Sequence, residues 1–463
     1  MVKLYPFPKD ESYSDSFDIT VDGTNVKSYL SHVSAVPFNQ VWPGYQRPFH
    51  QTEFCSFVSF GMEESVILRV KPNIPFEKVQ IRPLSKNIVP HIENGTITFS
   101  ISVCGQYTLE LDGYHNTLCI FANPIKEYAI KKSMPNVLYF AAGIHYPGKI
   151  TLESNQTLFL EEGAIVHTAV LCENVQNVRI LGHGILDNST FPRGGSNPIR
   201  LSGSSNVLID GVTIRDASEW SIIVGKCENI MIDNIKLIGM WRYNSDGVDF
   251  CNSANCVIKN SFLRNYDDCI VVKGLIRMAD KNTENILAEN CVLWCDWGRA
   301  LEVGAETCAK EMRDIIFKDC DIIHSTHIAM DIQHTDSAYV HDVTFENIRA
   351  EFDDRYEEPY LQSEKGEVYH DPSRGFMPSL FVLQLEKGMW SQQKEFGTLH
   401  EIRFCNITVY SNQMPPSYFT NANDESSVSE VIIENLVING RRIDCIDDAN
   451  LHCRGNFEQL HLS

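Results

Sequence analysis

Hydrophobic and polar residues alternate in a phrase that recurs along most of the chain. A polar residue is followed by an apolar–x–apolar triplet, an Asp or Asn, and a second apolar stretch, as in NVLIDGVTI at position 206 and NIMIDNIKL at position 229. Successive copies begin 23 to 30 residues apart, except for one interval of 59 residues between positions 342 and 401. Self-similarity at such a period is typical of a solenoid, a propeller or another repeat array.

The repeated phrase predicts strands rather than helices. It is rich in Val, Ile and Phe with a period of two, and few stretches between the copies have a helical period. This pattern favours a parallel β-helix, in which each coil stacks its strands on the coil below and an Asn or Asp marks the corner between strands. The interval of 59 residues is either two periods or one period that carries an insertion.

The segment before the repeats has a different pattern. Alternating strands such as SVILRVK and TITFSIS are separated by Pro, Gly and Asn turns there, which is typical of a β-sandwich. We therefore predict an all-β chain with a small β-sandwich domain at residues 1–125 and a parallel β-helix domain at residues 126–463. A polar, aromatic stretch at about residues 351–400 is expected to form an insertion loop on one face.

Composition limits the partners of the chain. With 43% hydrophobic and 21% charged residues the composition is that of a folded soluble protein, and the formal net charge of −21 disfavours nucleic acid and anionic membranes as partners. The first residues lack the apolar stretch of a signal peptide, so we expect a cytoplasmic protein unless an export signal has been removed. Fifteen cysteines without metal-binding spacing favour buried free thiols in a reducing compartment.

Three aspartates have unusual neighbours. Asp246 lies in the turn-like NSDG, and the adjacent pair Asp267 and Asp268 follows about one coil later. Stacked strands lie roughly 4.8 Å apart, so we expect the three carboxyls to cluster. The pair precedes the apolar CIVV, where desolvation and like-charge crowding raise a carboxyl pKa. A protonated acid beside ionised acids can protonate a leaving oxygen while a base activates water.

These segments resemble a known family. NSDGVD followed by DDCIVVKG is similar to the signatures of the pectinase-like hydrolases of glycoside hydrolase family 28, the polygalacturonase-like family, whose fold is a right-handed parallel β-helix. GRALEVGAE and the opening coils, such as NVRILGHGILD, extend the resemblance over about residues 125–450. The preceding β-sandwich is similar to that of the dextranase and isopullulanase group, family 49.

The resemblance implies an inverting hydrolase of O-glycosidic bonds in an oligo- or polysaccharide. It assigns Asp267 as the general acid on the leaving oxygen, and Asp246 and Asp268 as the residues that hold and deprotonate the attacking water. The mechanism needs no metal and no cofactor.

The chain departs from the family pattern at two places. Arg299 stands where the family has a histidine, and MDIQHTD, which contains Asp331, Gln333 and His334, stands where the family has the Arg and Lys that bind galacturonate. Without that cationic pair a pectic substrate loses its charge-matching partners. We therefore expect a neutral glycan, dextran-like or galactose-containing, and exo action if the insertion closes one end of the groove.

The candidate substrate-binding residues come from the same coils. Arg299, Gln333 and His334 are polar or charged at the positions just described, and Glu302 lies on the Arg299 coil. Trp241 and Trp297 flank the aspartates, and their rings are suited to stacking on sugar faces or to core packing.

Several alternatives stay open at this point. One is a polygalacturonase acting on pectic oligosaccharides, and another is a polysaccharide lyase on the same helix. A third is a non-catalytic glycan-binding β-helix, because a fold does not determine a function. The sequence also leaves the sugar, the linkage and the oligomeric state undetermined.

Overall fold

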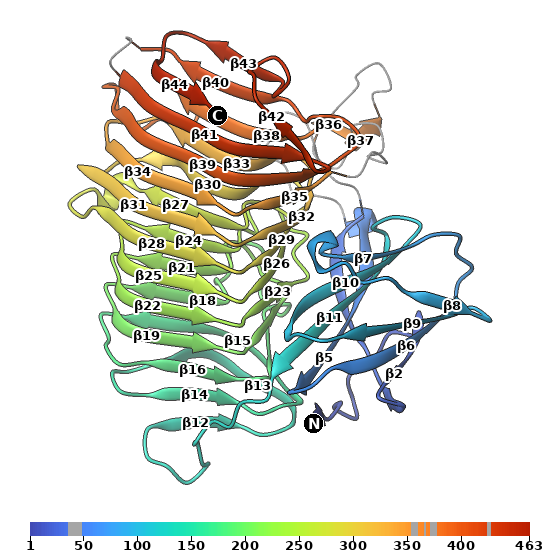
Figure 1. The fold of residues 1–463 in the computed structure, drawn as a ribbon. Helices are drawn as coiled ribbons and strands as arrows, with labels where there is room; N and C mark the ends of the chain where they lie inside the picture. The colour runs from blue at the N-terminus through green and yellow to red at the C-terminus, as the bar shows by residue number, and fades with distance from the viewer. Residues whose placement is uncertain (36–48, 353–359, 365–366, 371–376, 424–426) are drawn as a thin grey trace.

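The computed structural model describes residues 1–35, 49–352, 360–364, 367–370, 377–423 and 427–463. The described chain consists of strands, turns and three single-turn helices, η1 (Phe49–Gln51), η2 (Leu84–Lys86) and η3 (Ile276–Met278). A β-sandwich at the N-terminus lies beside a long stack of parallel strands (Figure 1). The predicted fold class, an all-β chain with a right-handed parallel β-helix after a small β-sandwich, is confirmed. None of the described helices has the length and apolar character needed to span a membrane.

The β-sandwich is formed by two sheets that share one apolar core, to which Val58, Val70 and Ile97 contribute. The first sheet contains β1 (Val2–Leu4), β4 (Tyr29–Ser34), β5 (Thr52–Met62), β7 (Val79–Arg82), β10 (Gly105–Leu111) and β11 (Asn116–Pro124). The second sheet contains β2 (Phe17–Val21), β3 (Thr24–Val26), β6 (Val66–Pro72), β8 (His91–Glu93) and β9 (Thr96–Ile101).

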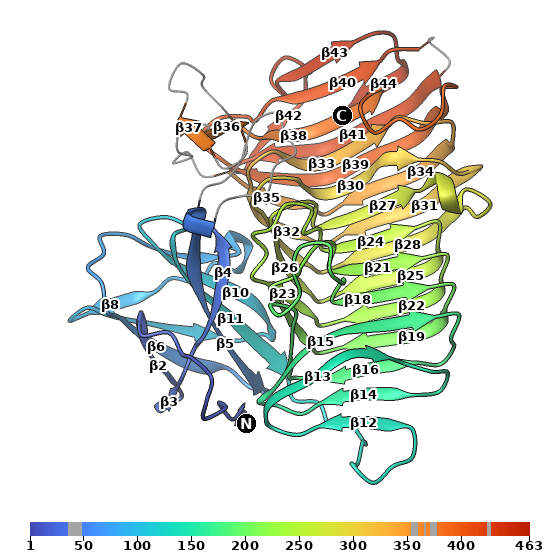
Figure 2. The ribbon, with the colours of Figure 1, turned by 180° about the vertical axis from the view of Figure 1, so that it is seen from behind.

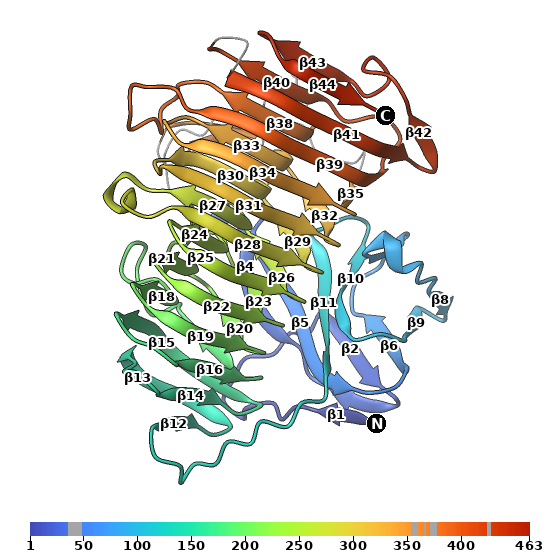
Figure 3. The ribbon, with the colours of Figure 1, turned by 60° about the vertical axis from the view of Figure 1, so that its left-hand side comes forward.

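The β-helix stacks its strands in three columns, each paired in parallel from coil to coil (Figure 3). Column 1 contains β12 (Val137–Phe140), β14 (Thr157–Leu160), β16 (Arg179–Gly182), β19 (Ser205–Asp210), β22 (Glu228–Asp233), β25 (Ala254–Lys259), β28 (Thr283–Glu289), β31 (Glu311–Lys318), β34 (Tyr339–Glu346), β39 (Thr398–Tyr410), β41 (Val428–Ile438) and β44 (Glu458–Leu462).

Column 2 contains β17 (Ile185–Asp187), β20 (Thr213–Arg215), β23 (Lys236–Ile238), β26 (Phe262–Asn265), β29 (Val292–Cys295), β32 (Asp321–Ser325) and β35 (Arg349–Glu351). Column 3 contains β18 (Ile199–Ser202), β21 (Ile222–Gly225), β24 (Val248–Cys251), β27 (Ile270–Gly274), β30 (Arg299–Thr307), β33 (Ile328–His334), β38 (Ser379–Leu385), β40 (Ser417–Asn421) and β43 (Leu451–Arg454). β13 (Gly143–Thr151) and β15 (Ala164–Glu173) run through columns 2 and 3 in the first coils. A short strand, β42 (Arg441–Ile443), pairs antiparallel with β41.

The Asn residues of the repeated phrase lie at corners between strands, as predicted. Asn260 and Asn290 both have φ 52°, in the left-handed region that Asn tolerates better than most residues. The side-chain amide of Asn290 donates to Oδ1 of Asn260 at 2.8 Å, and the ladder continues to Asn406, which donates to Asn347 at 3.0 Å. Because Asn347 and Asn406 are stacked neighbours, the interval of 59 residues is one coil with an insertion.

The insertion differs in extent from the predicted loop at about residues 351–400. β38 lies within that range and is a regular strand of column 3, paired with β33 on one side and β40 on the other. An antiparallel hairpin, β36 (Tyr360–Glu364) and β37 (Glu367–His370), precedes it. Residues 353–359, 365–366 and 371–376 of the predicted loop lie outside the described residues.

The β-sandwich packs along column 2 of the helix, as the view from behind also shows (Figure 2). Phe57 and Phe121 of the sandwich meet Phe262 and Trp294 of the helix in one apolar cluster. A buried ionic group lies at the same interface, because Glu110 accepts from Arg82 at 3.0 Å and from Nε2 of His324 at 2.9 Å. Among the described residues, none from the column 3 strands β18 to β43 belongs to that apolar cluster.

Candidate active site

The three predicted aspartates lie together at the start of column 3. Asp246 is in the turn before β24, and Asp267 and Asp268 are in the turn before β27. The two turns are joined because the backbone N–H of Gly247 donates to the carbonyl of Asp268 at 2.7 Å. All three carboxyls are buried, with 2% to 4% of each residue exposed. The sequence periodicity thus places the acids on adjacent coils, as expected from stacked strands.

Lys273 connects the carboxyls of several coils. Its Nζ lies 3.9 Å from Oδ2 of Asp246 and of Asp268, 4.0 Å from Oδ1 of Asp249 and 3.6 Å from Oε2 of Glu306. Burial acts to lower the pKa of Lys273, but these acids outweigh it and raise that pKa well above its usual value. Lys273 therefore stays charged and partly neutralises the acids.

Arg299 provides the second cation of the site. Its backbone N–H donates to Oδ1 of Asp268 at 2.9 Å, its Nε to Oδ2 of Asp331 at 3.2 Å and its Nη2 to Oε1 of Gln333 at 3.0 Å. Oε1 of Glu302 lies 3.9 Å from Nε. Of the predicted binding residues, Arg299, Glu302 and Gln333 are thus brought together beside Asp268.

Gly298 allows this close approach between coils. A Cβ atom at position 298 would lie 2.5 Å from Oδ1 of Asp268 and 2.6 Å from Oδ1 of Asp267. Any side chain at position 298 would displace both carboxyls. Their arrangement therefore requires glycine at this position.

The environments of Asp267 and Asp268 push their pKa values in opposite directions. Burial, followed by the charge of Asp268, raises the pKa of Asp267 to about 7. Burial also acts to raise the pKa of Asp268, but Arg299 and Lys273 outweigh it and hold that pKa below its usual value. Adjacent carboxyls with separated pKa values are suited to act as a proton donor and an ionised partner at one pH.

Asp246 and Asp249 complete the acidic cluster. Burial raises the pKa of each well above the usual range, and neighbouring carboxylates add to the effect at Asp246. Oδ1 of Asp246 and both carboxyl oxygens of Asp249 are buried without a hydrogen-bond partner among the described residues. Unpaired buried polar atoms are costly and are concentrated where function requires them. Asp249 was not among the predicted site residues, and its contact with Lys273 makes it part of the charge cluster.

His334 is not brought into this cluster. It is fully buried, and its ring nitrogens contact Oγ1 of Thr307 at 2.7 Å and the carbonyl of Ala338 at 3.0 Å. Both nitrogens are therefore occupied within the protein, which does not support the predicted substrate contact. The residue was proposed because MDIQHTD stands at the place of the family's substrate-binding pair, but its ring contacts Thr307 and Ala338 of the protein instead.

The tryptophans take different positions. Trp297 is 6% exposed and packs in a cluster with Tyr266 and Tyr243, and Nε1 of Trp241 donates to Oδ1 of Asp216 at 3.0 Å. Both rings thus pack against other side chains of the protein rather than against the acids. Trp220 does contact the site, because Nζ of Lys273 lies 4.9 Å from its ring centre.

Sequence reasoning missed Lys273 as a member of the site. The signal was a single lysine in the otherwise apolar strand CIVVKG, which needs a buried counter-charge. Identifying those counter-charges required knowing which coils are neighbours.

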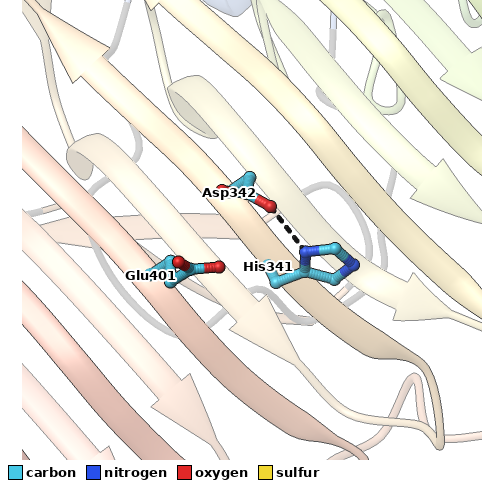
Figure 4. Close-up of side chains that lie close together, drawn as sticks. All are labelled: His341, Asp342 and Glu401. Carbon is cyan, nitrogen blue, oxygen red and sulfur yellow. Dashed lines mark hydrogen bonds and ion pairs between the residues drawn. The ribbon is translucent and has the colours of Figure 1, made fainter.

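One group of side chains elsewhere has donors close enough to hold a metal ion. The ligand atoms of His341, Asp342 and Glu401 all lie within 4.8 Å of one another, on the neighbouring strands β34 and β39 of column 1 (Figure 4). Nδ1 of His341 already donates to Oδ2 of Asp342 at 2.7 Å. The group lies on another column from the acids and takes no part in their chemistry.

The acids lie within a part of the chain that matches a known protein family. Residues 131–353 match the family model described as Glycosyl hydrolases family 28. The predicted resemblance is therefore confirmed, and this part of the chain is related to the hydrolases of that family.

Curated relatives match over part of their length. An exopolygalacturonase of Cochliobolus carbonum is 30% identical over 110 residues, which are 23% of each chain, and rhamnogalacturonase A of Aspergillus niger is 23% identical over 38% of this chain and 37% of its own. The matched region thus spans less than half of these relatives.

Solved structures share the fold over a larger part of the chain. Dex49A from Penicillium minioluteum has a TM-score of 0.69 at 14% identity and covers 100% of this chain and 96% of its own. An exopolygalacturonase from Thermotoga maritima has a TM-score of 0.53 at 14% identity and covers 66% of this chain and 84% of its own. At this identity the likeness shows the fold alone.

Proposed function

We propose that this chain, whose residues 131–353 match the glycosyl hydrolases of family 28, hydrolyses O-glycosidic bonds with inversion at the anomeric carbon. The observation that carries the proposal is the separation of the pKa values of Asp267 and Asp268 within one buried cluster. Two neighbouring carboxyls held in different protonation states are what acid–base catalysis of glycoside hydrolysis requires.

Each carboxyl has one role in the proposed reaction. Asp267, protonated below pH 7, transfers its proton to the glycosidic oxygen as the bond from the anomeric carbon to that oxygen breaks. Asp268 and Asp246 hold the water whose oxygen attacks the opposite face of the anomeric carbon, and the ionised Asp268 accepts its proton. Lys273 and Arg299 keep Asp268 ionised before the water is deprotonated.

The charges of the site support a neutral glycan as the substrate. Seven acids, Asp246, Asp249, Asp267, Asp268, Glu302, Glu306 and Asp331, surround Lys273 and Arg299. The guanidinium of Arg299 already contacts Asp331 and Gln333. A galacturonate carboxylate would therefore meet two cations that already have acidic partners within the protein.

A polygalacturonase remains the second candidate, because the curated relatives include enzymes named for galacturonan. Action on pectic oligosaccharides would require Arg299 to exchange an internal partner for a substrate carboxylate. Whether the enzyme removes units from a chain end or cleaves within the chain is a further prediction, and the size of the first products measures it.

The test is a turnover screen of the wild type against dextran, pullulan, galacto-oligosaccharides and galacturonan, with product anomers followed by NMR. We expect cleavage of one neutral glycan with inversion, and a loss of at least ~10²-fold in Asp267→Asn, as for a lost general acid. Asp280→Asn, at an exposed acid paired with Lys226, is the control.

Other outcomes select the alternatives. Cleavage of galacturonan alone favours the polygalacturonase, and unsaturated products indicate a lyase. If no glycan is cleaved, or if Asp267→Asn keeps full activity, the hydrolase proposal is wrong.

A further inference from the structure

A pocket lies on column 3, on coils that follow those of the acids. It has a volume of about 390 Å³ and is lined by His327, Ser379, Val382, Gln384, Met377 and Tyr418, together with neighbouring apolar residues. These residues come from β33, β38 and β40 and from the turns before them. The pocket therefore occupies the same face of the β-helix as the acids, on later coils.

The strand register connects the pocket to the acids. Val271 of β27 pairs with Glu302, Glu302 with Asp331, Asp331 with Val382, and Val382 with Tyr418. Gln384 pairs with Gln333, which accepts a hydrogen bond from Arg299. Three strand spacings separate Val382 from β27, which is roughly 14 Å along the helix axis. A glycan that passes Asp267 and follows the axis would enter the pocket a few sugar units from the bond being cleaved.

The lining of the pocket is uncharged. His327 is the one titratable imidazole in it, and burial, followed by the charge of Arg299, lowers its pKa to about 3, so the ring is neutral. The remaining polar groups in the described lining are the hydroxyls of Ser379 and Tyr418 and the amide of Gln384. Such groups bind sugar hydroxyls but cannot compensate the charge of a uronate.

Tyr418 offers an aromatic surface. It is 44% exposed, and its ring stacks on His452 of the next coil at 5.2 Å with an interplanar angle of 21°. The stacking holds one face of the ring in place, and the exposed part of the side chain lines the pocket. Sugar rings pack on such surfaces through their C–H faces.

We propose that this pocket is a subsite for uncharged sugar units of the glycan that is cleaved at Asp267, with Tyr418 and Gln384 as its specificity-determining residues. This inference rests on the proposed function for the position of the scissile bond. It adds that the enzyme selects glycans long enough to reach β38 and β40.

The test uses chain length. We would measure kcat/KM of the wild type, Tyr418→Ala and Gln384→Ala for isomalto- and galacto-oligosaccharides of two to seven units. The ratio of kcat/KM for the longest over the shortest substrate is expected to fall about tenfold in Tyr418→Ala, mainly through KM, as for one lost aromatic contact. Gln384→Ala should lower the same ratio by a smaller factor.

Tyr339→Ala is a matched control. Tyr339 is 40% exposed and stacks on His341 at 4.1 Å, but it lies on column 1. The Tyr339→Ala substitution removes a similar ring without changing the pocket. The ratio of kcat/KM for the longest over the shortest substrate should therefore equal that of the wild type. Thermal unfolding of each variant shows whether the fold is retained, and Gln384→Ala carries the test if Tyr418→Ala does not fold.

Binding measurements separate this proposal from the proposed function. Calorimetry with the heptasaccharides and with heptagalacturonide would compare Asp267→Asn with Asp267→Asn/Tyr418→Ala. About tenfold weaker binding of a neutral heptasaccharide in the double variant supports the subsite, even if the wild type cleaves none of the substrates. Equal binding by both proteins, or an effect of Tyr418 only on heptagalacturonide, overturns it.

Discussion

At the scale of single residues, two cations decide how the acids of the site are protonated. Asp267 and Asp268 are consecutive and equally buried, but Arg299 and Lys273 lower the pKa of Asp268 while burial and the charge of Asp268 raise that of Asp267. The assignment of the two roles therefore follows from the positions of Arg299 and Lys273.

The pH dependence of the reaction should report this arrangement. A general acid works while it is protonated, so kcat/KM is expected to fall about tenfold per pH unit above about pH 7. On the acidic side, activity should persist below pH 5, because Asp268 stays ionised there. A pH–rate profile of the wild type measures both limbs. A rate that stays constant up to ~pH 9 would contradict the role of Asp267.

Gly298 provides a test of the geometry that leaves every charge in place. Gly298→Ala puts a Cβ about 2.5 Å from a carboxyl oxygen of Asp268, so the carboxyls must move. We expect kcat to fall by ~10²-fold, since small misplacements of catalytic groups are costly. Gly388→Ala, where nothing lies within 4 Å of the added Cβ, is the control and should keep its rate. Equal rates in the two variants would show that the close approach is unnecessary.

Some site residues were predictable from the sequence and others were not. Asp246, Asp267 and Asp268 were, because their spacing equals one coil and stacked coils bring equivalent positions together. The orientation of His334 was not, because its place in a family motif does not determine which groups of the protein its ring contacts. Lys273 required the identity of its neighbours on two other coils.

At the scale of the elements, the turns of the β-helix are held by side-chain amides. The Asn ladder made the coils visible in the sequence, since most of the left-handed corners carry Asn or Asp. The register of β38 was hidden, because the inserted residues before it interrupt the repeat. Periodicity therefore predicted the regular coils and failed at the irregular one.

Two substitutions at Asn290 separate the contribution of the side-chain hydrogen bond to stability from that of the left-handed backbone conformation. Asn290→Ala loses the hydrogen bond to Asn260 and puts alanine, which tolerates the left-handed region less well than Asn, at φ 52°; together these should reduce the free energy of unfolding by about 2 kcal/mol. Asn290→Gly loses the hydrogen bond but tolerates the backbone, so its loss should be about 1 kcal/mol. Urea unfolding measures both. If glycine is the more damaging change, the corner conformation is not the main requirement.

At the scale of the whole molecule, the β-sandwich and the β-helix are joined by apolar contacts and a buried ionic group. Arg82 and His324, one from each part, hold the pKa of Glu110 at about 2 although burial acts to raise it. The sandwich is therefore fixed along column 2, next to the turns that carry the acids.

The ionic group should make stability depend on pH. The pKa of Glu110 is below its unfolded value of roughly 4.3, so its contribution is present above that value and is lost as pH falls towards 2. We expect Glu110→Gln to be less stable by about 3 kcal/mol at pH 7, because it removes one of the two acids paired with the buried Arg82. The difference in Tm from the wild type should shrink between pH 5 and pH 3. A difference that is independent of pH would indicate that packing, not charge, is responsible.

The three-column stack also bears on how such proteins diverge. The acids lie in turns between β23 and β27, whereas the proposed subsite lies on β38 and β40, several coils further along the β-helix. Duplication or deletion of one coil between them would change their separation by roughly 4.8 Å and leave both sets of side chains intact. Genes for this fold can therefore acquire a new preference for substrate length in single steps, without altering a catalytic residue.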